Sequence, residues 1–351
     1  MRICAICETP YQVMTMMNYA TAREEFLDYK IDLFVGSKFK TYLTVAGNVS
    51  KESIFDDVYV YDYSRAGSAA NRLNFISKPS KYISRLCGKE LKQGSYNVIF
   101  TSNLTTFMMA MVLANPDAEV YYYDDGIASY TYKIGPNYLT GKKRLLFKFY
   151  RIDIERFYPK KLYLNNASMF IDGWNVPLVQ MPPLSGASEE CYAAMSRVFG
   201  SIPEFYKDHK KIFLTNPIEM RDESVRALQE QRKNKVIEIL SGMDVVRRPH
   251  PRETVKPGGN MVIDDSGCLW EQVCMKTINS EYTLIGAAST AMISPKMFFD
   301  QEPRLIFLFK ALDFPVDKTF LQLLDKLIKS YKNPDDIVIV ENIDELPALL
   351  S

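Results

Sequence analysis

Residues 2–36 read RICAICETPYQVMTMMNYATAREEFLDYKIDLFVG and contain the pattern that decides the fold. The runs 2–7 and 30–36 are rich in β-branched and aromatic residues and end at polar or glycine-containing turns, as buried strands do. The stretch 10–24 between them has the apolar periodicity of a helix. A strand, a helix and a second strand in this order predict a parallel sheet covered by helices.

The same alternation continues along the chain and restarts once. The segment 175–188 carries three prolines and two serines, a composition suited to a linker. We therefore expect an α/β chain of two Rossmann-like domains, 1–175 and 190–351, with parallel sheets facing a central cleft and a linker at about 175–190. Further strands are expected at 57–63, 96–102, 118–123, 210–215, 243–248, 281–286, 304–309 and 336–341.

The composition disfavours several classes of protein. Hydrophobic residues make up 47% and charged residues 24%, as in an average globular protein. Lys plus Arg (43) nearly balances Asp plus Glu (42), so no overall field would attract nucleic acid. The six cysteines repeat no disulfide or zinc spacing, and we expect them to be reduced and mostly buried. Without a signal peptide or an apolar run of ~18 residues, the expected location is the cytoplasm or the inner membrane face.

Residues 142–151, KKRLLFKFYR, mix five basic residues with apolar and aromatic ones. Such a stretch could lie on an anionic membrane surface as a peripheral contact. A helix packed at the domain junction with solvated lysines explains it equally simply, and we favour that interpretation.

Two candidate sites follow strands of the first domain. Thr9-Pro10-Tyr11-Gln12 can form a T-x-x-Q capping box, but it lies where a ligand crevice is expected, so Gln12 could also bind a sugar hydroxyl. Asp124-Asp125-Gly126 could be an ordinary Asp-Gly turn. Two adjacent carboxylates at a crevice repel each other, however, and the raised pKa of one would suit a proton acceptor.

Two more candidate sites follow strands of the second domain. In 247–252, RRPHPR, the prolines hold His250 on a stiff loop among three arginines, a setting typical of a phosphate or carboxylate site. In 286–290, GAAST, small residues allow close approach of a ligand, and Ser289 and Thr290 supply hydroxyls at a helix start. A stray basic loop and an ordinary helix cap are the alternatives.

Together, YYYDDG, RRPHP and AAST resemble the three short motifs of bacterial sialyltransferases, in the same order. CETPYQ near the N-terminus is similar to glycosyltransferase family 52, the lipooligosaccharide sialyltransferase family. The resemblance spans most of the chain and implies a GT-B enzyme. It would transfer sialic acid from CMP-sialic acid with inversion, to a terminal sugar such as galactose on a surface glycan.

The resemblance also implies roles for individual residues. The first domain would take the acceptor and the second the donor, with His250 donating a proton to the departing phosphate. One phosphate needs no divalent ion, so we expect no metal and no cofactor. The substrate-binding residues would be Gln12, Gly126, Arg247, Arg248, Pro251, Arg252, Gly286, Ser289 and Thr290.

The general base is left between several carboxylates. The motif favours Asp125, with Asp124 beside it. Family 52 could instead place its base in the second domain, where Glu219 and Asp222 follow the strand at 210–215. Those two residues could equally form the acidic first turn of a helix.

Three alternatives stay open from the sequence. The donor could be another nucleotide sugar such as a UDP-hexose, or the chain could be a non-catalytic glycan-binding partner in surface polysaccharide assembly. A binder has no need of a proton donor such as His250, which argues against the second. A Rossmann oxidoreductase is disfavoured because no G-x-G-x-x-G follows the first strand. Lipooligosaccharide and capsular polysaccharide both remain as acceptors, and a homodimer is one of the open oligomeric states.

Overall fold

The computed structural model describes residues 1–67, 74–90, 94–131, 141–171, 176–217, 222–253 and 261–351. The chain forms two compact units, Met1–Phe199 and Gly200–Ser351. Each unit has its own parallel sheet and its own buried core.

The first unit is built on a seven-stranded sheet in the order β3-β2-β1-β4-β5-β6-β7, and all of its strand pairs are parallel. The order reverses beside β1, which is the topological switch point where Rossmann-like sheets bind ligands. Its strands are β1 (Arg2–Cys7), β2 (Lys30–Gly36), β3 (Asp57–Tyr61), β4 (Val98–Thr101), β5 (Glu119–Tyr123), β6 (Lys161–Leu164) and β7 (Leu178–Gln180).

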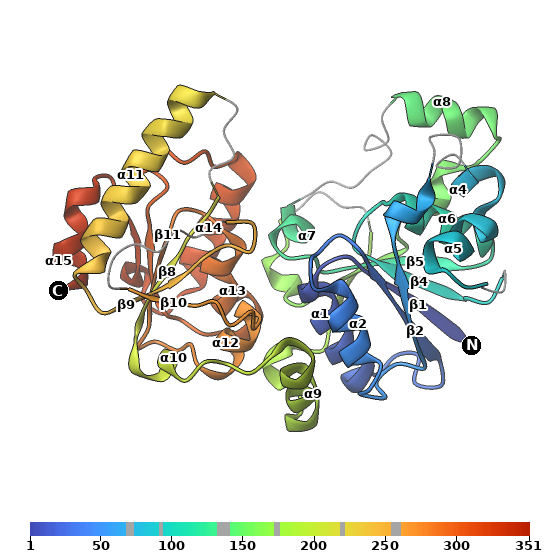
Figure 1. Cartoon of the computed structure of the whole chain (residues 1–351), viewed down its shortest axis with the longest axis horizontal. Helices are drawn as coiled ribbons and strands as arrows, with labels where there is room; N and C mark the ends of the chain where they lie inside the picture. Colours follow the sequence, from blue (N-terminus) through green and yellow to red (C-terminus); the bar gives the residue numbers. More distant parts are fainter. Residues whose placement is uncertain (68–73, 91–93, 132–140, 172–175, 218–221, 254–260) are drawn as a thin grey trace. The chain divides into compact units, whose positions relative to one another are not determined.

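Helices cover both faces of this sheet, α1 and α2 on one side and α4, α5 and α6 on the other (Figure 1). The first helix starts as its sequence predicts: Thr9 is the N-cap, its side chain accepts from the Gln12 N–H, and Pro10 is the first helical residue. The helices are α1 (Pro10–Ala22), α2 (Tyr42–Val49), α4 (Asn74–Ser77), α5 (Pro79–Cys87), α6 (Thr106–Ala114), α7 (Ile127–Thr131), α8 (Gly141–Phe149) and α9 (Glu189–Phe199).

The second unit repeats the design with a six-stranded parallel sheet in the order β10-β9-β8-β11-β12-β13. Here the switch point lies between β8 and β11. The strands are β8 (Lys211–Leu214), β9 (Val245–Arg248), β10 (Val262–Ile263), β11 (Thr283–Gly286), β12 (Arg304–Phe307) and β13 (Ile337–Ile339). The helices are α10 (Phe205–Asp208), α11 (Glu223–Ser241), α12 (Trp270–Lys276), α13 (Thr290–Phe299), α14 (Lys318–Ser330) and α15 (Leu346–Leu350).

All ten expected strands are confirmed, and the structure adds β6, β7 and β10. The expected linker differs from the structure, because its residues are built into the first unit: β7 pairs with β6, and α9 packs on α1 and α2. The boundary between the compact units falls after Phe199 instead. Prolines on both sides of β7 made a short edge strand look like a linker.

The cysteines are free thiols, and five of them are buried, including Cys4 and Cys7 inside β1. Burial raises the pKa of the Cys7 thiol to about 12, so this C-x-x-C pair belongs to the core, as expected. Within the described ranges, no helix is long and apolar enough to cross a membrane.

Candidate functional site

Asp124 is the first residue after β5, and it is fully buried. Its Oδ1 accepts from the Gly126 N–H at 2.8 Å, and its Oδ2 accepts from the Asn165 N–H at 3.0 Å and from the Tyr130 hydroxyl. Burial raises its pKa to about 6, although these hydrogen bonds act in the opposite direction. Gly126 has a φ of 87°, which favours glycine. The buried carboxylate therefore holds the turn that presents its neighbour.

That neighbour, Asp125, is only half-buried. Its Oδ1 accepts from the side-chain Nε2 of Gln12, and its Oδ2 accepts from the Nδ2 of Asn103 at 2.8 Å. Burial raises the pKa of Asp125, the two amide hydrogen bonds oppose that rise, and the nearby charge of Glu8 adds to it. A fixed, partly exposed carboxylate with increased proton affinity suits a general base.

Gln12 makes a contact close to that of a capping box, and its side chain orients Asp125. Its side chain is fully buried. The Oε1 accepts from the Glu8 N–H at 2.5 Å, one residue before the position of a regular capping box, and the Nε2 also donates to the Ser102 Oγ at 2.6 Å. Gln12 thus ties the start of α1 to the end of β4 and orients Asp125.

Sequence reasoning missed Glu8, which directly follows β1 and is 5% exposed. Its Oε2 pairs with Lys38 at 2.5 Å, and its Oε1 accepts from the hydroxyls of Tyr61 at 3.0 Å and Tyr63 at 3.1 Å. The available signal was its position: a carboxylate directly after a buried strand at the switch point. Glu8 adds a second negative charge beside Asp125.

In the second unit, His250 lies on a tight turn after β9. The Glu253 N–H donates to the His250 carbonyl at 2.8 Å, with Pro251 in the second position of the turn, where proline is favoured. The Arg252 N–H donates to the Nδ1 of the imidazole at 3.1 Å. A ring nitrogen that accepts a hydrogen bond carries no proton, so in this arrangement Nε2 is the ring nitrogen that carries the N–H.

The turn is anchored by Glu253. Its carboxylate accepts from Lys233 at 2.5 Å, from Arg247 at 3.1 Å and from the Thr215 hydroxyl. Burial alone would raise the pKa of Glu253, but the hydrogen bonds from Lys233 and Thr215 and the charges of Lys233 and Arg247 hold it below its ordinary value. Because α11, β8 and β9 all contribute, the His250 turn is held from three elements.

Arg248 differs from the expectation that it binds the substrate phosphate. Its guanidinium donates to Asp264, to the Tyr206 hydroxyl at 3.1 Å and to the Cys268 carbonyl, and it lies 5.5 Å from the Trp270 ring. This cation is used inside the unit. Neither of its buried partners could be identified from spacing, because Asp264 and Tyr206 lie far away in sequence.

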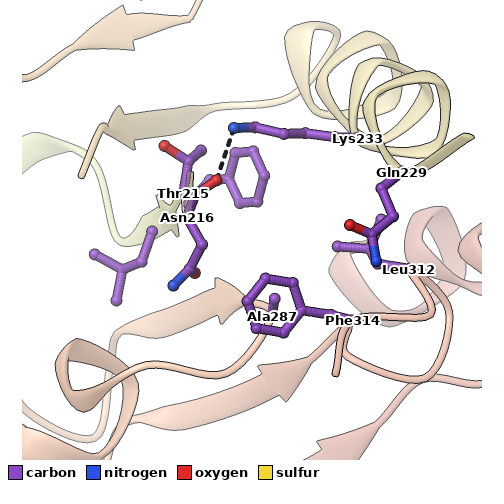
Figure 2. Close-up of a pocket in the computed structure, with 9 residues that line it drawn as sticks. Thr215, Asn216, Gln229, Lys233, Ala287, Leu312 and Phe314 are labelled. Atoms are coloured by element: carbon purple, nitrogen blue, oxygen red, sulfur yellow. Dashed lines mark hydrogen bonds between the residues drawn. The ribbon is translucent and has the colours of Figure 1, made fainter. Parts of the chain in front are cut away.

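A pocket of about 170 Å³ opens beside the His250 turn, at the carboxyl ends of the strands. A smaller apolar pocket adjoins it and shares Asn216, Gln229 and Phe314 with it. Figure 2 shows the smaller one, with Asn216 and the Phe314 ring bordering the same space and Lys233 bonded to the Asn216 carbonyl. The larger pocket is lined by Asn216, Pro217, Gln229, His250, Arg252, Phe314 and Pro315.

The small-residue segment after β11 lies next to these pockets. The Asn216 Nδ2 donates to the Ala288 carbonyl at 3.5 Å, which connects the segment to the pocket wall. Gly286 has a packing reason, since a Cβ there would lie 2.9 Å from the Leu214 carbonyl oxygen. Ser289 is the N-cap of α13, and its side chain makes no capping hydrogen bond. The hydroxyls of Ser289 and Thr290 therefore lie at the start of α13, directly after Ala288, and neither residue is among those that line the two pockets.

The two alternative candidates for the general base are Asp222 and Glu219. Asp222 is the N-cap of α11, and its carboxylate accepts from the Ser224 hydroxyl at 2.6 Å and from the Ser224 N–H at 2.9 Å. These hydrogen bonds lower the pKa of Asp222, and the one with the Ser224 side chain contributes most. Glu219 lies outside the residues that the structure describes. In the described part of the chain, no three His, Cys, Asp or Glu side chains gather in a way that could hold a metal ion.

The sequence did not single out Asn216, Gln229, Lys233 or Phe314 as pocket residues. Asn216 follows a predicted strand directly, so its place at the sheet edge was readable. Gln229 and Lys233 lie one turn apart on α11, and Phe314 follows β12, so only the fold brings them together.

No protein-family model matches the sequence, and no curated protein does. Solved structures do resemble it. The sialyltransferase from Photobacterium damsela superimposes with a TM-score of 0.51 at 14% identity, over 97% of this chain and 81% of that one. The glycosyltransferase SnogD from Streptomyces nogalater gives 0.51 at 10% identity, covering 100% and 90%. The UDP-GlcNAc 2-epimerase from Methanocaldococcus jannaschii gives 0.51 at 10%, covering 99% and 91%. The chain therefore has the GT-B fold, with two Rossmann-like domains.

Proposed function

We propose that this chain is an inverting, metal-independent sialyltransferase that transfers sialic acid from CMP-sialic acid to a terminal galactose of a bacterial surface glycan. One observation carries the proposal: His250 and Arg252 line a pocket at the switch point of the second sheet, and the imidazole is held by the Arg252 N–H. The motifs around Asp125 and Ser289 support it, as does a fold shared with a sialyltransferase.

The reaction breaks the bond between the anomeric carbon of sialic acid and the phosphate oxygen of CMP. The bonding electron pair leaves with the phosphate, and the transition state resembles an oxocarbenium ion. An acceptor hydroxyl attacks the opposite face of that carbon, so its configuration inverts, and the proton of this hydroxyl passes to Asp125. The acceptor is assigned to the first unit and the donor to the second.

His250 assists departure of the phosphate as a neutral hydrogen-bond donor. Its Nδ1 already accepts from Arg252, so loss of the Nε2 proton would leave an unfavourable imidazolate. Hydrogen-bond donation from Nε2, in place of the full proton transfer expected from the resemblance, is therefore the role proposed for His250. Arg252 and the start of α13 complete the charge stabilisation of the single phosphate.

Asp125 acts as the base because it is fixed, partly exposed and raised in pKa. Gln12 is a positioning residue that acts through Asp125. Asp124 keeps the turn in place, and Asp222 keeps the helix cap.

The test is a donor panel with the purified full chain in excess EDTA. CMP-sialic acid, UDP-glucose and UDP-galactose are each incubated with and without a galactose-terminated oligosaccharide, and nucleotide release and product are measured. The proposal predicts that nucleotide is released from CMP-sialic acid and from neither UDP-sugar. The acceptor should increase this release, and EDTA should not affect it. Transfer only from a UDP-sugar would show that the donor is that sugar nucleotide and not CMP-sialic acid. Binding of the oligosaccharide without turnover of any donor would indicate a glycan-binding protein.

We also propose that α8 contacts an anionic membrane surface. Leu145 and Phe149 are 70% and 80% exposed and lie four residues apart, on one side of the helix. Phe147 is buried and packs against Phe75 and Phe157, with ring centroids at 6.3 Å and 5.3 Å, so it fixes the helix to the first unit. Exposed apolar side chains beside the exposed Lys148 are typical of an interfacial helix.

A further inference from the structure

The side-chain amide of Asn216, beside the pockets of the second unit, has an unpaired acceptor oxygen. Asn216 follows β8 and borders both adjoining pockets. Its side-chain Oδ1 is buried and has no hydrogen-bond partner among the described residues. A buried acceptor left unpaired is unfavourable, so a ligand that donates a hydrogen bond here would gain binding free energy.

The orientation of this amide is fixed by its other end. The Nδ2 donates to the Ala288 carbonyl at 3.5 Å. The reversed amide would place two acceptor oxygens against each other, at the Ala288 carbonyl. In this orientation the Oδ1 is the atom of the amide left for a ligand, and its complement is an N–H or O–H donor.

The surroundings favour a flat heteroaromatic ring as the group that carries the donor. Phe314 and Pro315 line the larger pocket, and Ala287, Leu312 and Phe314 line the smaller one. The Gln229 Nε2 donates to the Asp313 carbonyl at 2.7 Å, which holds the turn that presents Phe314. An aromatic ring can stack on Phe314 while its edge reaches Asn216.

We propose that the Asn216 Oδ1 accepts a hydrogen bond from the exocyclic amine of cytosine and thereby selects a cytidine nucleotide over a uridine nucleotide. Cytosine presents an N4 amine, where uracil presents a carbonyl oxygen. Uracil would leave the buried Oδ1 unpaired and facing a second acceptor, and a site built around a hydrogen bond rejects such an analogue strongly. The inference rests on the proposed function, since it takes this pocket as the donor nucleotide site.

The experiment measures the dissociation constants of CMP and UMP in EDTA by calorimetry, for wild type, Asn216→Leu and Asn216→Asp. We expect wild type to bind CMP at least about tenfold more tightly than UMP. Asn216→Leu, which is similar in size but has no acceptor, should lower this ratio to about one. Asn216→Asp keeps an acceptor at Oδ1 but places a second oxygen against the Ala288 carbonyl, so it should keep the preference for CMP while binding both nucleotides more weakly. Thermal unfolding identifies any variant that fails to fold, and the wild-type ratio together with Asn216→Asp then remains a test.

Equal binding of CMP and UMP by wild type would overturn the inference, as would an unchanged ratio in folded Asn216→Leu. If the folded wild type binds neither nucleotide, both the inference and the proposed function fail. If CMP is preferred through Asn216 but sialic acid is not transferred, the inference stands and only the proposed reaction fails.

Discussion

The carboxyl edges of the two sheets use their polar side chains in different ways. In the first unit, both oxygens of Asp125 already accept hydrogen bonds, from Gln12 and Asn103. In the second, the Asn216 Oδ1 is buried without a partner among the described residues, and Asn216 borders an open pocket. The base of the first edge is held before any ligand arrives, although the buried Oδ1 of Asn165, which follows β6, also lacks a partner among the described residues. The second edge combines such an unpaired acceptor with a pocket that a ligand can fill.

The largest effect should come from Asp125→Asn, which removes the base but keeps a side chain of the same shape. We expect kcat to fall by roughly 10²–10⁴, the usual contribution of general base catalysis. Asp222→Asn is the matched control, because asparagine also caps helices well and only the carboxylate is lost. Initial rates of acceptor-dependent CMP release measure both. A large loss in Asp222→Asn with little in Asp125→Asn would move the base to the second unit.

Substitutions of Arg248 and Arg252 compare a residue that supports the second edge with a residue that lines its pocket. Arg248→Met breaks a buried ion pair with Asp264 and should lower the free energy of unfolding by about 3–5 kcal/mol. The exposed Arg252→Met should leave stability within about 1 kcal/mol of wild type and weaken CMP binding. Urea unfolding and calorimetry distinguish the two. Normal stability in Arg248→Met would show that this arginine is not structural.

The pH profile tests whether Gln12 tunes Asp125. The base must be ionised, and its pKa is raised, so activity should fall with decreasing pH at a higher pH than for an ordinary carboxylate. Gln12→Leu removes a hydrogen bond that stabilises the ionised form, so this acidic limb should move further up, with about tenfold lower kcat near its midpoint. Gln272 is equally buried and does not touch Asp125. Gln272→Leu should therefore leave the limb in place, and a shift in both variants would contradict a specific role for Gln12.

The smallest effect concerns a surface apart from both edges. Leu145→Glu combined with Phe149→Glu should reduce sedimentation with phosphatidylglycerol-containing vesicles by about tenfold or more, because two exposed apolar side chains lose their burial in lipid. Activity on a soluble acceptor should not change. Leu27→Glu with Leu43→Glu adds the same charges at other exposed leucines and serves as the control. Equal loss in both pairs would indicate a general charge effect and remove α8 as the contact.

The sequence predicted ten strands because long apolar or aromatic runs ending at turns are strong local signals. It missed β6, β7 and β10, which are four, three and two residues long. Length alone does not explain these misses, since β8 and β13 are four and three residues long and were predicted. Pairing with a neighbouring strand defines β6, β7 and β10, and no local pattern contains that pairing. The boundary of the units was displaced for the same reason, since only packing on α1 and α2 assigns α9 to the first unit.

The candidate site divides in the same way. Asp125, His250 and Ser289 could be proposed from sequence because each lies within three residues of a strand's end, and the carboxyl ends of parallel strands form the ligand edge. Arg248 looked identical to Arg247 and Arg252 in the sequence, yet a distant carboxylate at Asp264 uses its charge. Asn216 and Phe314 are far apart in the chain, and only the fold brings them to one pocket.

The most direct test of the central claim compares the two histidines of the chain. Acceptor-dependent transfer from CMP-sialic acid in EDTA is measured for wild type, His250→Ala, His250→Gln and His209→Ala. His209 pairs with Asp244 away from the pocket and is the internal control. We predict a loss of roughly 10²–10³ in kcat for His250→Ala, partial recovery in His250→Gln, which keeps an N–H donor, and little change for His209→Ala. Wild-type rates in folded His250→Ala would contradict the assignment of this pocket as the donor site.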